Sequence, residues 1–145
     1  MSILTPLLNR ELAPGMYRLV TRVGSARLCA EIEAHGWRCL RIAGGQAADK
    51  ATFLHAVSAA LGFPAYVGQN WDALADALGD LSWAPADGYV LLYERANVFA
   101  EREPTQWAMA REIFAEACDY WATRGTPFYV LVRGATAGAG LARLA

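Results

Sequence analysis

Apolar and polar positions along the chain follow two different repeats. Short continuous apolar runs, such as Tyr89 to Tyr93 and Phe128 to Val132, are typical of parallel strands that are covered on both faces. The segments between such runs place apolar residues every three or four positions, which is typical of amphipathic helices. This alternation predicts an α/β domain in which crossover helices join the strands of a small parallel sheet.

The expected elements can be given with their ends. Strands are predicted at Met16 to Val20, Trp37 to Ala43, Tyr89 to Tyr93 and Phe128 to Val132. Helices are predicted from Ser25 to His35, from Asp49 to about Gly62, from Asn70 to about Gly79 and from Pro104 to about Gly125, with Ser25, Asp49 and Asn70 as N-terminal caps. The Gly and Ala content of residues 134–145 predicts a mobile C-terminal tail with one helical turn at Leu141 to Leu144.

Length and composition narrow the possible classes of protein. The chain has 145 residues, 55% of them hydrophobic and 19% charged, which is enough for one domain with its own core. The net charge of -1 argues against binding to nucleic acid or to an anionic membrane through bulk charge. Residues 51–71 carry no charge, but Gly62, Pro64 and Gly68 interrupt this stretch, so we expect no membrane-spanning helix.

The cysteines and the N-terminus bear on the compartment. Cys29, Cys39 and Cys118 are odd in number and lack the spacing of a zinc or redox site. The first ten residues lack the basic start and long apolar run of a secretory signal. The sequence therefore predicts a cytoplasmic protein with three reduced thiols.

The negative charge is concentrated in the middle of the chain. Residues 51–94 contain no Lys or Arg, and their five acidic residues are Asp72, Asp76, Asp80, Asp87 and Glu94. Three of these are four positions apart in the helix predicted at residues 70–79, so they share one face. Like charges at this spacing destabilise a helix, and no basic residue nearby compensates for them. We therefore interpret this face as functional, although an ordinary solvated surface remains an alternative.

Small residues flank the acidic positions of this helix. They are Ala73, Ala75, Ala77 and Gly79, and the apolar stripe of Trp71, Leu74, Leu78 and Leu81 lies roughly opposite the carboxylates. The helix can therefore bury one side and present the other to a partner. Without long side chains on the exposed side, a partner surface can approach the helix backbone closely.

Nine residues in the run from Leu61 to Leu78 form one sequence motif. They read Pro-x-Tyr-x-Gly-x-Asn-x-Asp-Ala-Leu-x-Asp-x-Leu, that is Pro64, Tyr66, Gly68, Asn70, Asp72, Ala73, Leu74, Asp76 and Leu78. This pattern resembles the signature of the barstar family, the intracellular inhibitors of secreted bacterial ribonucleases. The resemblance covers residues 38–133 as a barstar-like domain, with residues 1–37 as an N-terminal strand and helix packed on it. It implies a three-layer α/β fold.

The resemblance also implies a mode of action. In the family, the short helix and the loop before it block the nuclease active site with carboxylates that occupy the place of RNA phosphates. Here that role falls on Tyr66, Gly68, Asn70, Asp72 and Asp76, with Asp76 as the central aspartate. The expected partner-binding surface comprises Tyr66, Val67, Gly68, Asn70, Asp72, Ala73, Asp76, Gly79 and Asp80. The expected partner is a basic, extracellular-type ribonuclease or a related toxin, bound without cofactor, metal or catalysis.

Four positions depart from the family pattern. Val67 and Ala75 stand where family members can carry aromatic residues, and Tyr120 and Arg124 replace acidic residues of the long helix. These departures leave the predicted fold unchanged but bear on the identity of the partner.

Two alternatives from other classes remain. A barstar-like fold could bind a different basic protein, such as a toxin that is not a ribonuclease. A carboxylate enzyme that uses a metal is less favoured, because residues 72, 76 and 80 span about 12 Å along a helix and cannot meet at one ion. His35, at a predicted helix end, and His55, on a predicted wet face, have no nucleophile or acid nearby in the predicted arrangement.

Overall fold

A computed structural model describes residues 2–145 of the protein. Its five strands form one parallel sheet. The spatial order is β2-β3-β4-β1-β5, and every neighbouring pair is parallel. The strands are β1 (Met16–Leu19), β2 (Arg38–Ala43), β3 (Tyr89–Glu94), β4 (Phe128–Val132) and β5 (Ala142–Leu144). The predicted α/β class and the four predicted strands are confirmed, within one or two residues at their ends.

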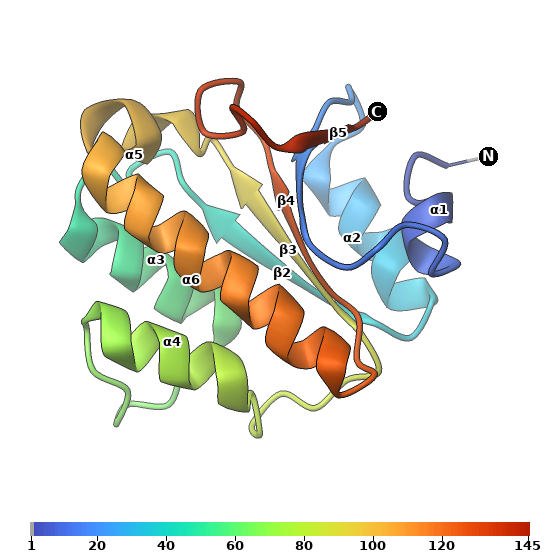
Figure 1. The fold of residues 1–145 in the computed structure, drawn as a ribbon, viewed down its shortest axis with the longest axis horizontal. Helices are drawn as coiled ribbons and strands as arrows, with labels where there is room; N and C mark the ends of the chain where they lie inside the picture. Colours follow the sequence, from blue (N-terminus) through green and yellow to red (C-terminus); the bar gives the residue numbers. More distant parts are fainter. Residues whose placement is uncertain (1) are drawn as a thin grey trace.

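Helices cover both faces of this sheet, which gives three layers (Figure 1). The helices are α1 (Thr5–Leu8), α2 (Ser25–Ala34), α3 (Lys50–Leu61), α4 (Trp71–Asp80), α5 (Asn97–Arg102) and α6 (Pro104–Thr123). Buried residues of α3, α4, α5 and α6 share one core cluster, and those of α1 and α2 share the other.

The central strands divide their side chains between the two clusters. In β3, Tyr89, Leu91 and Tyr93 face α3 to α6, whereas Val90 and Leu92 face α1 and α2. All five are at most 2% exposed. Burial on both faces explains why this strand is apolar at consecutive positions and not at alternate ones.

The ends of α3 follow from its sequence. The Asp49 side chain accepts a hydrogen bond of 2.9 Å from the Thr52 backbone N–H, and the Asp49 N–H donates to Thr52 Oγ1 at 3.2 Å. The backbone hydrogen bond from Thr52 holds the pKa of Asp49 below its usual range. Gly62 ends the helix with a left-handed φ of 65°. The predicted cap at Asp49 and stop at Gly62 are both confirmed.

The predicted cap of α2 is wrong. The N-terminal cap is Gly24 and makes no side-chain hydrogen bond, while Ser25 is the first helical residue and is 6% exposed. The helix ends at His35, followed by Gly36 at a φ of 89°, as the sequence predicted. Because Ser25 is the first residue inside the helix, its hydroxyl does not occupy the cap position.

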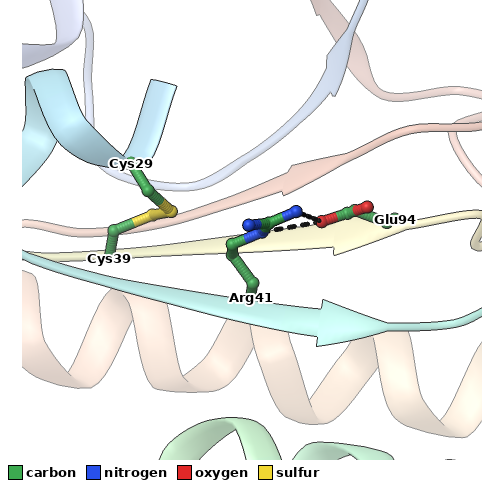
Figure 2. Close-up of a disulfide and its surroundings, with 4 residues drawn as sticks. All are labelled: Cys29, Cys39, Arg41 and Glu94. Atoms are coloured by element: carbon green, nitrogen blue, oxygen red, sulfur yellow. Dashed lines mark hydrogen bonds and ion pairs between the residues drawn. A yellow bond between two sulfur atoms is a disulfide. The ribbon is translucent and has the colours of Figure 1, made fainter. Parts of the chain in front are cut away.

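The prediction of three reduced thiols is also wrong. Cys29 of α2 and Cys39 of β2 form a disulfide with a Cα–Cα distance of 5.2 Å (Figure 2). Cys118 is a free thiol. Cys29 and Cys39 meet because the chain turns back at Gly36 and lays α2 over the start of β2. Their spacing of ten residues in the sequence does not reveal this proximity.

The C-terminal segment is ordered by contacts, in contrast to the predicted mobile tail. Ala137 is fully buried, its N–H donates to Asn97 Oδ1 at 2.9 Å, and its carbonyl oxygen accepts from Trp107 Nε1 at 3.1 Å. Residues 142–144 form β5 beside β1 and not a helical turn. The prediction from Gly and Ala content failed because the contacts that order this segment are made by backbone groups. Amino-acid composition does not show such contacts.

Removal of residues 134–145 tests whether this segment contributes to the stability of the fold. We expect the free energy of unfolding to fall by about 2 kcal/mol or more, because the deletion leaves the buried Trp107 indole N–H without its acceptor and exposes the edge of β1. Urea unfolding followed by tryptophan fluorescence measures the change. A chain that lacks only the exposed Ala145 is the control. Equal stability of the shortened chain and the full chain would restore the mobile-tail interpretation.

Candidate functional site

The helix α4 begins at a side-chain cap. The Asn70 Oδ1 accepts a hydrogen bond of 2.8 Å from the Ala73 backbone N–H, and Asp72 lies in the first turn, where a negative charge is favourable. Leu81 ends the helix in a left-handed conformation, with a φ of 50°. The predicted cap at Asn70 is confirmed, and α4 extends to Asp80, one residue beyond the predicted end.

Two tryptophan indoles attach α4 to the long helix α6. Trp71, at the start of α4, donates from Nε1 to Gln106 Oε1 at 3.1 Å. Trp121 of α6 donates from Nε1 to the carbonyl oxygen of Leu78, near the end of α4, at 2.7 Å. Both ends of α4 are therefore fixed to the same neighbour. Trp71 is half-buried against the core, as expected for a core residue rather than a contact residue.

A third indole positions the segments on either side of α4. Trp83, after the helix, donates from Nε1 to the carbonyl oxygen of Leu61 at 3.0 Å and packs edge-on against Phe63. The loop between Phe63 and Asn70 then runs along the outside of α4. Tyr66 stands at its tip with 78% of its surface exposed, the largest value among the large apolar and aromatic side chains of residues 2–145.

The three aspartates of α4 face solvent, as the helical spacing predicted. Asp72, Asp76 and Asp80 are all exposed, while Leu74 and Leu78 on the other side of the helix are at most 1% exposed. The ion pair within residues 2–145 is formed by Arg41 and Glu94, at 2.8 Å, and neither residue lies in α4. No cationic side chain of the described chain therefore pairs with the α4 carboxylates. The face is an uncompensated negative surface.

One hollow beside α4 gathers most of the predicted surface. It has a volume of about 330 Å³ and lies between the helix and the preceding loop. Its lining residues are Tyr66, Val67, Gly68, Ala73, Asp76, Ala77, Asp80 and Trp83. The structure therefore brings together six of the nine residues predicted from the sequence.

Gly68 permits the close approach of the loop to the helix. A Cβ at this position would lie 3.1 Å from Asn70 Nδ2 and 3.6 Å from the Ala73 Cβ. The Val67 backbone N–H donates to the Pro64 carbonyl oxygen at 3.0 Å, which closes a turn just before the glycine. Loop and cap are thus packed as one unit.

A second hollow lies on the other side of α4, against α6. It has a volume of about 370 Å³ and is lined by Ala75, Asp76, Gly79, Ile113, Glu116, Ala117 and Tyr120. Asp76 lines both hollows and is exposed. Of the remaining predicted residues, Gly79 lines this second hollow, Asn70 serves as the cap, and Asp72 lines neither of the two.

The sequence singles out Tyr120 and Arg124 of α6 only as departures from the family pattern, and it does not predict that α6 forms a wall of the site. Glu116 adds a carboxylate on the wall opposite Asp76, and Tyr120 closes the same hollow under a stacked guanidinium, with Arg124 Cζ at 4.4 Å from the ring centre. Ile113, Glu116 and Tyr120 follow one another at helical spacing. That spacing could have placed them on one face, but the sequence does not reveal that this face lies beside α4.

The histidines and the groups that could hold a metal can be located relative to the two hollows. Within residues 2–145 no group of three or more His, Cys, Asp or Glu side chains is placed to hold a metal ion. His35 caps the end of α2 beside Trp37, and His55 is exposed on α3, so neither histidine is part of the two hollows. Among the same residues no helix has the length and apolar character needed to cross a membrane.

One family model matches most of the chain. The family model described as Barstar (barnase inhibitor) matches residues 37–133. This range contains β2, β3, β4 and the helices α3 to α6, and therefore both hollows. A search of curated proteins found none that matches the chain.

The cap of α4 can be tested with Asn70→Ala. This substitution removes the acceptor of the Ala73 N–H, and we expect the free energy of unfolding to fall by about 1 kcal/mol. Asn70→Asp is the matched control, because it keeps an acceptor oxygen and adds a favourable charge at the helix N-terminus. Thermal unfolding followed by circular dichroism measures both variants. If both lose the same stability, the cap is not the cause.

The attachment of α4 to α6 can be tested with Trp121→Phe. The substitution leaves the Leu78 carbonyl oxygen without its donor, and we expect a loss of about 1 to 2 kcal/mol and faster hydrogen exchange in α4. Tyr120→Phe removes an exposed hydroxyl next to it and is the control. Unchanged exchange of the α4 amides in Trp121→Phe would contradict the anchoring role.

Proposed function

Because this chain belongs to the Barstar (barnase inhibitor) family, we propose that it is an intracellular inhibitor of a bacterial ribonuclease. It would act as an antitoxin or immunity protein that binds the nuclease at a ratio of one to one, without catalysis. The bound surface would consist of the exposed face of α4 and the loop before it, and it would cover the nuclease active site.

The observation that supports this proposal best is the position of Asp76. This exposed residue lines both hollows and has no cationic partner within the described chain. A ribonuclease cleft must hold cationic side chains that converge on the RNA phosphates. A carboxylate that projects from a rigid helix complements such a cleft, and the neighbouring hollows can receive side chains from its rim.

The other predicted residues take supporting roles in this proposal. Tyr66 offers a large exposed aromatic surface next to the first hollow, which is typical of residues that contribute strongly to interfaces. Asp72 and Asp80 extend the negative charge along α4. The small residues Ala73 and Gly79 keep the helix backbone accessible between the carboxylates.

A different basic partner is the second candidate, and one observation favours it. The residues that depart from the family pattern surround Asp76. Val67 lines the first hollow, Ala75 and Tyr120 line the second, and Arg124 stacks on Tyr120. The central aspartate of the family pattern is thus present, while the residues around it differ from that pattern. This pattern fits a partner whose cationic cleft resembles that of barnase but whose surrounding surface differs.

The proposal is tested by Asp76→Ala together with the double variant Asp72→Ala/Asp76→Ala. The partner would be isolated from the lysate and secretome of the source cell with the wild-type protein, and its RNA cleavage would be followed during titration. We expect wild type to stop cleavage at one equivalent, and Asp76→Ala to bind at least about 30-fold more weakly, as a central interface residue does.

Asp87→Ala is the matched control for this experiment. Asp87 is exposed, lies in the same acidic segment and loses the same charge on substitution, but it is not on α4. It should bind almost as wild type does, and wild-type binding should weaken as salt increases. Equal binding by wild type and the double variant would place the site elsewhere. Capture of a basic protein without ribonuclease activity would favour the second candidate.

A further inference from the structure

The Cys29–Cys39 disulfide crosses the boundary of the family match. Cys29 lies in α2, before residue 37, whereas Cys39 lies in β2, inside the matched range. Figure 2 shows the bridge between the helix and the strand below it. The Cα–Cα distance of 5.2 Å falls within the usual range for disulfides, about 4.4 to 6.8 Å. The bridge therefore ties the N-terminal segment to the barstar-like domain.

The helix α2, which carries Cys29, has few other local stabilising features. The helix α2 has no side-chain cap, no acidic residue in its first turn and no basic residue in its last turn. Its hold on the sheet comes from Leu28 and Ile32, which pack in the cluster shared with Val90 and Leu92. A covalent link at Cys29, next to Leu28, fixes the buried face of the helix directly.

One cysteine of the bridge is partly exposed, in contrast to the third cysteine. Cys39 is partly exposed and Cys29 is 8% exposed, whereas Cys118 is 1% exposed in the other core cluster. Burial raises the pKa of the Cys118 thiol to about 12, so it stays protonated and unreactive. The chain thus contains one cysteine pair with a partly exposed member and one buried thiol that serves as an internal reference.

The bridge is separated from the acidic face by the sheet. Residues of α2 pack in the cluster on one face, and Leu74 and Leu78 of α4 pack in the cluster on the opposite face. Figure 1 shows the two helices on different sides of the strands. A change at the bridge can therefore alter the stability of α2 without moving α4.

We propose that Cys29 and Cys39 form a redox-responsive clasp, which holds α2 on the sheet when oxidised and loosens this helix alone when reduced. The oxidant is a low-molecular-weight disulfide such as oxidised glutathione. The thiolate of the more exposed Cys39 attacks one of its sulfurs and releases one glutathione thiol. The Cys29 thiolate then attacks the mixed disulfide and releases the second, so two cysteine thiols are oxidised while one glutathione disulfide is reduced to two thiols.

The test uses the full chain equilibrated at a series of ratios of reduced to oxidised glutathione. Free thiols are then blocked with a maleimide under denaturing conditions, and the protein is analysed by mass spectrometry. We expect Cys29 and Cys39 to lose their labels together and to appear in one crosslinked peptide, while Cys118 is labelled throughout. Cys118→Ala should behave as wild type, and Cys39→Ser should form no intramolecular bridge.

Hydrogen exchange of the oxidised and reduced wild-type protein provides the second measurement and needs no substitution. We expect the amides of α2 to exchange about tenfold faster after reduction, and those of α4 to keep their rates. Two results would overturn the proposal: both cysteines remaining free at the most oxidising ratio, or α2 exchange that is the same in the two states. Neither measurement involves a nuclease, so the outcome is independent of the proposed function.

Discussion

The position of α4 depends on the hydrogen bonds that Trp71 and Trp121 make at its two ends. A helix of ten residues is marginally stable in water by itself, and the repulsion between three aspartates at intervals of four lowers its stability further. Tertiary contacts must therefore supply the order that the local sequence does not. The indole bonds do this at the two ends, while the buried leucines fix the rotation of the helix about its axis.

This anchoring has an electrostatic effect. Because the carboxylates project from a fixed backbone and have no cationic partner within residues 2–145, their field is directed outward and is not neutralised by the molecule itself. In the proposed complex, the partner would meet charges that are already in place, so little ordering entropy would be lost on binding. The destabilisation that these charges cause in α4 is compensated by packing against α6, on the side of the helix away from the exposed carboxylates.

The sequence predicted those features that depend on local burial and local hydrogen bonds. The four main strands, the acidic stripe and the caps at Asp49 and Asn70 follow from periodicity and from the chemistry of single residues. The disulfide, β5 and the wall that α6 adds to the second hollow could not be predicted in this way. Each of these depends on which segments become neighbours after folding. The tail shows this most clearly, since the backbone of Ala137 is fixed by Asn97 and Trp107, far away in the sequence.

The strand order separates the ends of the chain from the acidic face. The strands inside the family match, β2, β3 and β4, occupy one side of the sheet, and β1 and β5 are added beyond β4. In Figure 1, α1 and β5 lie at the far side of the molecule from α4. A tether at either terminus, to a bead, a fluorophore or a fused protein, would therefore hold the molecule with its acidic face turned outward and free to meet a second protein.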